Sequence, residues 1–130
     1  MDRSEVAVII PAHNERLTIG EVVTGVSPYG IPIVVDDAST DGTEELMRSY
    51  RDPRIRYFRQ PENIIGGSFL YLYREAVGEY LCMFGDDDRA LPGCFEKKLA
   101  ILEQRPDIDF VYSLWNRIDA QGRNQGVVRW

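Results

Sequence analysis

Hydrophobic residues along this chain fall into short, nearly continuous runs that are separated by segments with helical spacing. Residues 5–10 (EVAVII) and 31–35 (IPIVV) form two such runs, the pattern of strands that are buried on both faces. The apolar residues between them lie at roughly helical spacing: Leu17, Ile19, Val22, Val23 and Val26. Turn residues at 27–30 end this predicted helix. Strand, helix and strand in this order predict a βαβ unit with parallel strands.

The alternation of strands and helices continues along the rest of the chain. A helix is expected after the turn residues that follow Val35, with Asp41 as its N-cap and Glu44 completing a capping box. Residues 54–59 (RIRYFR) alternate in polarity and predict a strand with one solvated face. The later elements are expected to be a helix over 68–77, a buried strand over 80–84, a helix from Pro92, a strand over 109–114 and a turn at 120–123. We therefore predict an α/β fold in which helices flank a mostly parallel sheet in three layers.

Length and composition narrow the class of protein. A chain of 130 residues is long enough for one hydrophobic core, so we predict a single domain over residues 1–130. The net charge of −6 argues against binding to nucleic acid and suits a small ligand or a metal cation. The apolar run Val6–Ile10 is too short for a secretory signal or a membrane span. We expect a cytoplasmic protein with no transmembrane segment.

Unusual polar residues follow three of the predicted strands. They occupy residues 11–15 (PAHNE), 36–41 (DDASTD) and 86–88 (DDD). Parallel α/β sheets bind their ligands beyond the carboxyl ends of the strands. These three segments are therefore expected to meet at one edge of the sheet and to form the functional site.

The acidic segment 86–88 has two interpretations. Carboxylates at the end of a buried strand can hold Mg²⁺ or Mn²⁺, whose remaining ligands are waters and phosphate oxygens. The alternative is a solvated acidic turn that caps the helix beginning near Pro92. We favour the metal site because the segment follows a buried strand in this architecture.

Asp37 and His13 are weaker candidates when taken alone. Asp37 could accept a hydrogen bond from a nucleotide base or a ribose hydroxyl, or it could be a turn residue like its neighbours Ser39 and Asp41. A role for His13 as metal ligand or general base is disfavoured, because it is the only histidine and no cysteine lies beside it.

Four segments taken in order resemble the family 2 glycosyltransferases, which are inverting enzymes with the Rossmann-like GT-A fold. They are VAVIIPAHNE (6–15), IVVDDASTDGT (33–43), PEN (61–63) and AVGEYLCMFGDDDRALPGCFE (76–96). The resemblance implies a nucleotide-diphosphate sugar donor, with a UDP- or dTDP-sugar expected, that binds together with Mn²⁺ or Mg²⁺. It also implies transfer of the glycosyl group, with inversion, to the hydroxyl of a glycan or lipid-linked acceptor in polysaccharide biosynthesis. Peripheral association with the inner face of the membrane would be compatible with such an acceptor.

The resemblance also assigns roles to individual residues. The nucleotide pocket would be lined by Pro11, Ala12, His13 and Glu15, and Asp37 would read the base edge. The ribose, the metal and the sugar would be served by Asp86, Asp87 and Asp88. Gly85 stands where many family members carry the first Asp of a DxDD motif, which makes Asp87 the first choice for the metal. Strand alternation would instead place Asp86 and Asp88 on one face.

Family members continue beyond the region that this chain resembles, through an acceptor-binding part that holds the catalytic base. No residue here is assigned as that base, so we expect a donor-binding domain that is truncated before that part and is weak or inactive in transfer by itself. A non-catalytic nucleotide-sugar-binding module is an alternative. A sugar-nucleotide pyrophosphorylase is another, although residues 11–16 lack the glycine-rich basic loop that such enzymes show.

Overall fold

The computed structural model describes residues 5–64 and 66–129, and the chain divides into two compact units, Met1–Pro92 and Gly93–Trp130. The elements of the first unit are β1 (Val6–Ala12), α1 (Ile19–Val26), β2 (Ile31–Asp36), α2 (Thr43–Ser49), β3 (Arg56–Arg59), α3 (Gly67–Glu75) and β4 (Tyr80–Met83). Those of the second unit are α4 (Cys94–Gln104), β5 (Trp115–Ile118) and β6 (Asn124–Val128). The expectation of one domain over residues 1–130 stays a prediction.

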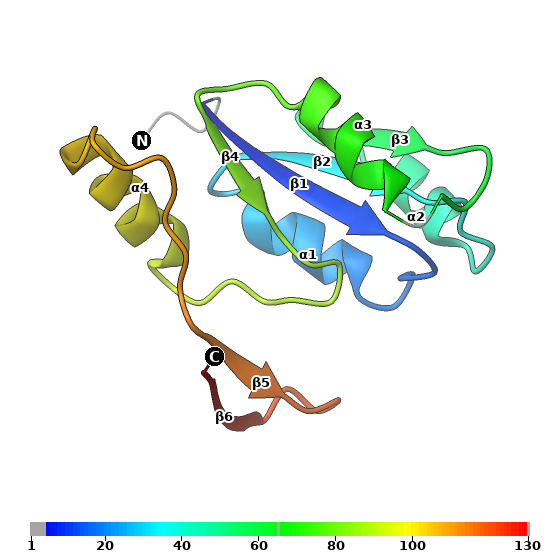
Figure 1. Cartoon of the computed structure of the whole chain (residues 1–130). Coiled ribbons are helices and arrows are strands. Elements are labelled where there is room, and N and C mark those ends of the chain that lie inside the picture. The colour runs from blue at the N-terminus through cyan, green and yellow to red at the C-terminus, as the bar shows by residue number, and fades with distance from the viewer. Residues whose placement is uncertain (1–4, 65, 130) are drawn as a thin grey trace. The chain divides into compact units, whose positions relative to one another are not determined.

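The first unit is built on a parallel sheet with the strand order β3-β2-β1-β4 (Figure 1). β1 pairs with β2 from Ala7 opposite Ile31, and with β4 from Val6 opposite Tyr80. Figure 1 shows α1 and α3 on opposite faces of this sheet. The predicted α/β class is therefore confirmed, and the carboxyl ends of all four strands open at one edge.

The core lies around the two central strands, as their hydrophobic runs predict. Alternate side chains of β1 and β2 pack against Leu72 of α3, and this cluster comprises Ala7, Ile9, Ile33, Val35 and Leu72. The side chains of α1 that are buried are Ile19, Val22, Val23 and Val26. Burial of each Val or Ile side chain contributes about 1.5–3 kcal/mol, so these central strands form a firm base for the loops that follow them.

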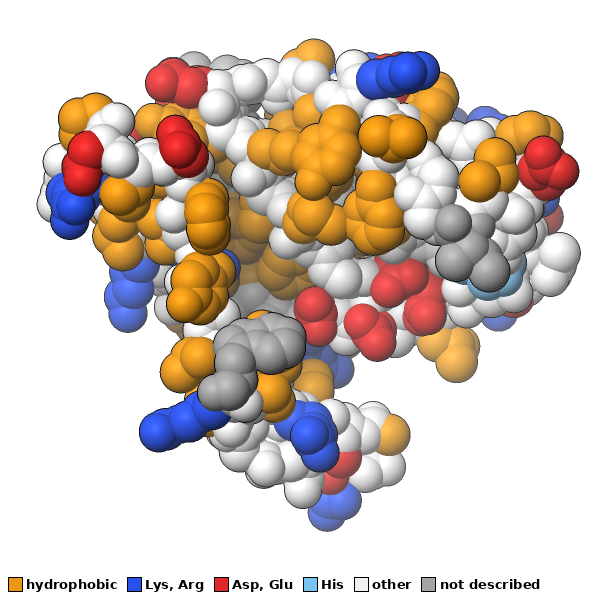
Figure 2. All heavy atoms as spheres, in the orientation of Figure 1, with side chains coloured by type: hydrophobic (Ala, Val, Ile, Leu, Met, Phe, Trp, Pro, Cys, Tyr) orange, Lys and Arg blue, Asp and Glu red, His pale blue; other side chains and the backbone are white. Residues whose placement is uncertain are grey.

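β4 is less buried than its apolar sequence predicts. Leu81 and Met83 keep 44% and 49% of their surface exposed. In the described part of the chain β4 pairs only with β1, which places it at the edge of the sheet. Figure 2 shows hydrophobic side chains gathered on the surface over α3 and β4.

The strand predicted over residues 109–114 is wrong. These residues form no ladder in the structure, and the side chains of Phe110 and Tyr112 are 75% and 73% exposed. The strand begins at Trp115 instead and pairs antiparallel with β6 around the predicted turn at 120–123. The apolar and aromatic residues within 109–114 favour a strand, but without a partner or a buried face they do not produce one.

The helix after β2 also begins differently from the prediction. Its N-cap is Gly42, with φ of 91°, and Asp41 lies one residue earlier. Asp41 Oδ1 accepts a hydrogen bond from the Thr43 N–H at 3.0 Å. Glu44 pairs with Arg48 and Arg59 instead of returning to the cap, so the capping box does not form.

No helix among the described residues combines the length and the apolar character that crossing a membrane requires.

Candidate functional site

The residues that directly follow β2, β3 and β4 are joined to the neighbouring strands by backbone hydrogen bonds. The Asp37 N–H donates to the Ala12 carbonyl at 2.8 Å, and the Gln60 N–H donates to the Asp36 carbonyl at the same distance. The Phe84 N–H donates to the Ile9 carbonyl at 3.0 Å. These bonds continue the parallel ladders beyond the strands and place the three predicted polar segments at one edge.

Asp36 is the most buried carboxylate at this edge, with none of its surface exposed. Its Oδ1 accepts the Ser39 N–H at 2.8 Å, and its Oδ2 accepts the Tyr57 hydroxyl at 2.6 Å. Burial, followed by the hydrogen bond to Asp36, raises the pKa of Tyr57 above its usual range, so the phenol stays protonated. The pair holds the turn at Ser39. The sequence pattern did not select Tyr57. The one feature that could have pointed to it is a side chain with a hydroxyl group in a strand predicted to have one solvated face.

We expect Tyr57→Phe to lower the free energy of unfolding by about 1.5–2 kcal/mol, because a buried carboxylate loses one of its two donors. Urea unfolding measures this loss. Tyr50→Phe is the matched control, since its hydroxyl donates to a neutral carbonyl, that of Gly20, at 3.3 Å. Equal losses in the two variants would contradict a special role for the Asp36 pair.

Asp37 lies beside Asp36 and is almost covered, with 8% of its surface exposed. Its Oδ1 accepts the backbone N–H of Ile64 at 2.8 Å, and its carbonyl accepts a hydrogen bond from His13 Nδ1 at 2.6 Å. Among residues 5–64 and 66–129, no hydrogen bond engages the second carboxylate oxygen of Asp37, Oδ2. It is positioned to accept one more hydrogen bond from a ligand.

The first polar segment, residues 11–15, begins within β1. Pro11 and Ala12 are the last residues of β1, and Ala12 is buried while Pro11 is half-buried. His13 and Asn14 are exposed beyond them. Glu15 accepts the Thr18 hydroxyl at 2.7 Å, and its carbonyl accepts the N–H groups of Thr18 and Ile19 at the start of α1.

The three aspartates after β4 do not share one environment. Burial and then the charge of Glu15, with a smaller contribution from Asp87, raise the pKa of Asp86 to about 6. Asp87 and Asp88 are exposed, and both carboxylates approach Gly85. A Cβ atom built on Gly85 would lie 2.5 Å from Asp88 Oδ2 and 3.4 Å from Asp87 Oδ1. The carboxylates of Asp87 and Asp88 thus lie together beside Gly85, and Asp86 lies with Glu15. This differs from the arrangement that strand alternation predicts, in which Asp86 and Asp88 share one face.

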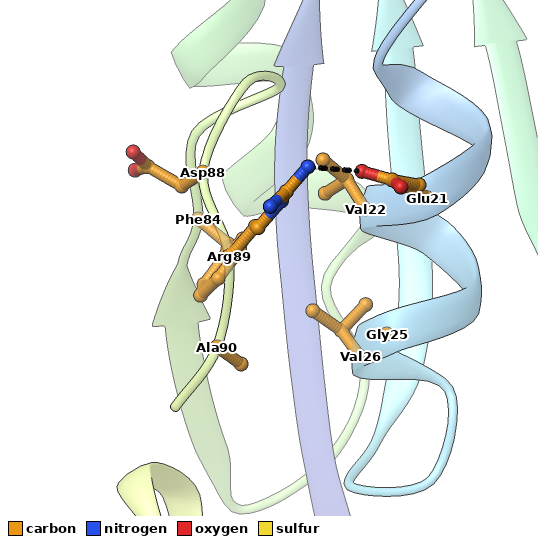
Figure 3. A pocket seen from close by; sticks show the side chains of 8 residues that line it. All are labelled: Glu21, Val22, Gly25, Val26, Phe84, Asp88, Arg89 and Ala90. Atoms are coloured by element: carbon orange, nitrogen blue, oxygen red, sulfur yellow. Dashed lines mark hydrogen bonds and ion pairs between the residues drawn. The ribbon is translucent and has the colours of Figure 1, made fainter. Parts of the chain in front are cut away.

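The loop after Asp88 is attached to α1. Arg89 Nη2 donates to Glu21 Oε2 at 3.1 Å across a cavity of about 350 Å³, which Val22 and Val26 also line. Figure 3 shows Arg89 reaching toward α1 while Asp88 points away from it. Because both partners are largely exposed, the pair itself contributes about 0–1 kcal/mol.

The carboxylates of Asp87 and Asp88 are suited to a divalent cation that binds together with a phosphate-containing ligand. Among the described residues, no group of three or more His, Cys, Asp or Glu side chains is gathered to hold a metal ion. Mg²⁺ is commonly held by one or two carboxylates, with waters and substrate phosphates completing its shell. Asp87 and Asp88 match that requirement, whereas a cage made only by the protein is not present in this part of the chain.

Comparison with known proteins gives evidence that is independent of the geometry of the site. The family model described as glycosyl transferase family 2 matches residues 7–129. An uncharacterized glycosyltransferase of Methanocaldococcus jannaschii is 28% identical over 131 residues, which cover 94% of this chain and 45% of that protein. The glycosyltransferase TuaG of Bacillus subtilis is 32% identical over 109 residues, which cover 77% of this chain and 42% of that protein. Its name assigns that protein to teichuronic acid biosynthesis.

The fold also has a counterpart among solved structures. The crystal structure of residues 1–349 of S. aureus TarS superposes with a TM-score of 0.67 at 22% identity, over 78% of this chain and 33% of that chain. The chain spans less than half the length of the two relatives.

Proposed function

Because the chain belongs to glycosyl transferase family 2, we propose that its first unit binds a nucleotide-diphosphate sugar at the carboxyl edge of the sheet. In the whole protein the glycosyl group would pass to an acceptor hydroxyl with inversion. The observation that supports this most is Asp37, which is nearly covered, is oriented by Ile64 and has a second oxygen with no hydrogen-bond partner among the described residues.

The state of Asp37 favours a particular kind of base. Its Oδ1 is already engaged by the Ile64 N–H, so one oxygen remains for a ligand donor. Uracil and thymine each present a single ring N–H, at N3, between two carbonyls. Guanine presents two neighbouring donors, which pair best with a carboxylate whose two oxygens are both open, whereas Oδ1 of Asp37 already accepts the Ile64 N–H. A UDP- or dTDP-sugar is therefore the proposed donor.

The remaining roles follow from the two carboxylate groupings. Asp87 and Asp88 would hold Mn²⁺ or Mg²⁺ on the diphosphate, and Asp86, which lies beside Glu15 and His13, would serve the ribose. When bound, the cation supplies Lewis-acid stabilisation of the charge that develops on the leaving diphosphate. Pro11, Ala12, His13 and Glu15 form the rim beside the nucleotide. The base that an inverting transfer needs is not assigned to any residue of this chain.

Calorimetric titration with UDP, dTDP, GDP and ADP, with and without Mn²⁺, tests this proposal. We expect UDP and dTDP to bind in the presence of the metal, and GDP and ADP to bind at least tenfold more weakly. Asp87→Ala should remove the metal dependence, and Asp37→Asn should weaken binding with or without metal. Asp109→Ala, an equal change of charge at an exposed residue of the second unit, is the control. If no nucleotide binds under either condition, the proposal is wrong.

A further inference from the structure

Asn14 occupies a strained position between the loops that follow β1 and β2. Its φ of 56° lies in the left-handed region, which non-glycine residues seldom adopt and which asparagine tolerates better than most. Its N–H donates to Ser39 Oγ at 2.8 Å, and its Oδ1 accepts the Thr40 N–H at 2.8 Å. A backbone N–H can only donate, so Thr40 determines which end of the Asn14 amide is the oxygen.

The orientation of this amide determines the protonation of His13. With Oδ1 held by Thr40, the amide nitrogen of Asn14 faces His13 Nε2 at 3.2 Å. An amide nitrogen donates and does not accept, so Nε2 must carry the lone pair. On the other side of the ring, Nδ1 lies 2.6 Å from the Asp37 carbonyl, which can only accept. Both contacts require the neutral tautomer with its hydrogen on Nδ1.

A third loop joins the same ring. Asn63, in the loop after β3, places its amide nitrogen 3.3 Å from His13 Nε2. No hydrogen bond found in the described residues holds the other end of this amide, so Asn63 can turn over and adapt to either tautomer. Asn14 cannot, because Thr40 holds its oxygen. Of the two amides, only that of Asn14 therefore keeps a hydrogen off Nε2, while the Asp37 carbonyl requires the hydrogen on Nδ1.

We propose that Asn14 is a positioning residue that, together with the Asp37 carbonyl, holds His13 in the Nδ1–H tautomer, so that the imidazole ties the loops after β1, β2 and β3 into one preformed rim beside Asp37. In this arrangement both ring nitrogens are engaged, and His13 acts as a connector and not as a base or a metal ligand. The consequence for nucleotide binding rests on the proposed function, whereas the tautomer does not.

The tautomer can be read directly, since His13 is the only histidine in the chain. Long-range ¹H–¹⁵N spectra of the labelled protein at pH 8 distinguish a protonated from an unprotonated ring nitrogen. We expect Nδ1 to carry the hydrogen in the wild type. Asn14→Asp keeps the oxygen that Thr40 requires but replaces the donor by an acceptor, so Nε2 should become protonated. A wild-type signal from the Nε2–H tautomer, or no change in Asn14→Asp, would overturn the proposal.

Two further variants separate this role from a general loss of structure. Asn14→Gly keeps the left-handed backbone and removes the whole side chain, so the fold should persist. The Asp37 carbonyl still favours a hydrogen on Nδ1, but the fraction of rings with a hydrogen on Nε2 should rise above that of the wild type. Asn124→Asp changes the charge equally on β6, where Oδ1 accepts the Gly126 N–H, and should leave the His13 spectrum unchanged.

Titration with UDP and Mg²⁺ then measures the effect on the rim. Both Asn14 variants should bind UDP about tenfold more weakly than the wild type, the size expected for one lost hydrogen bond. Wild-type affinity in both variants would overturn the positioning role. If the wild type itself fails to bind UDP, the proposed function fails, while the tautomer result still decides whether Asn14 controls His13.

Discussion

Asp86→Asn is expected to raise the free energy of unfolding at pH 7.5 by about 2 kcal/mol while lowering metal-dependent UDP binding. Burial and the charge of Glu15 raise the pKa of Asp86 to about 6, from an ordinary value of 3.8. A shift of this size corresponds to about 3 kcal/mol at 1.36 kcal/mol per pKa unit. We reduce it to about 2 kcal/mol because Asp86 keeps part of its surface in solvent, which screens the charge.

The gain should depend on pH in a definite direction. A carboxyl whose pKa is raised by folding binds its proton more tightly in the folded state than in the unfolded state. Wild-type stability is therefore unaffected by this group below about pH 4, falls as the pH rises from about 4 to 6, and stays lowered above that. Asparagine does not titrate, so the difference between variant and wild type should be near zero at pH 4 and complete above pH 6.5.

Urea unfolding at a series of pH values measures this difference. Asp109→Asn, the same substitution at an exposed residue, is the control and should show a nearly constant small difference. A variant that is less stable than the wild type at pH 7.5, or a difference that does not change with pH, would contradict the assignment of strain to Asp86.

This expected trade between stability and binding suggests why the carboxylate is placed there. Asp86 and Glu15 come from the ends of different strands, and their like charges repel in a partly dry environment. Functional sites often retain such unfavourable charges, and removing them stabilises the protein at the expense of activity. In the proposed function, a cation bound nearby with the diphosphate would offset this repulsion.

The elements that sequence alone predicts well are those whose burial is complete. β1 and β2 are apolar on both faces and lie at the centre of the sheet, so their hydrophobic pattern is enough to predict two parallel buried strands. The strand predicted over residues 109–114 failed because residue type shows a preference for extended structure and not a pairing partner. β4 was found, but its exposure depends on its place at the sheet edge, which no local pattern reports.

The candidate site divides in the same way. Asp37 and the segment 86–88 could be selected because carboxylates directly after strands are unusual. Tyr57 and Asn14 could not, because their importance comes from partners far away in sequence, Asp36 for one and Thr40 for the other. Sequence position shows where a loop begins, whereas the hydrogen bonds between loops appear only when the loops are folded side by side.

Gly85→Ala is expected to weaken metal-dependent UDP binding by about 10–100-fold, the range seen when the support of a metal ligand is removed, with little change in stability. Gly85 stands where many family members carry a first carboxylate, and here Asp88 folds back over it. A Cβ atom 2.5 Å from Asp88 Oδ2 is closer than packing allows, so the Asp88 side chain must move away. The backbone of Gly85 is not in the left-handed region, and the atom in the way is the end of a flexible side chain. Stability should therefore change by no more than about 0.5 kcal/mol.

A double-mutant cycle decides whether Gly85 acts through Asp88. If the glycine serves only to let the Asp88 carboxylate lie beside Asp87, then Asp88→Ala and the double variant Gly85→Ala/Asp88→Ala should bind UDP and Mn²⁺ equally weakly. Gly25→Ala is the control glycine, because a Cβ there meets no atom within 4 Å, and its binding should match the wild type. Independent, additive losses at Gly85 and Asp88 would show that the methyl group obstructs the nucleotide itself and that Asp88 is not a ligand held in place by the glycine.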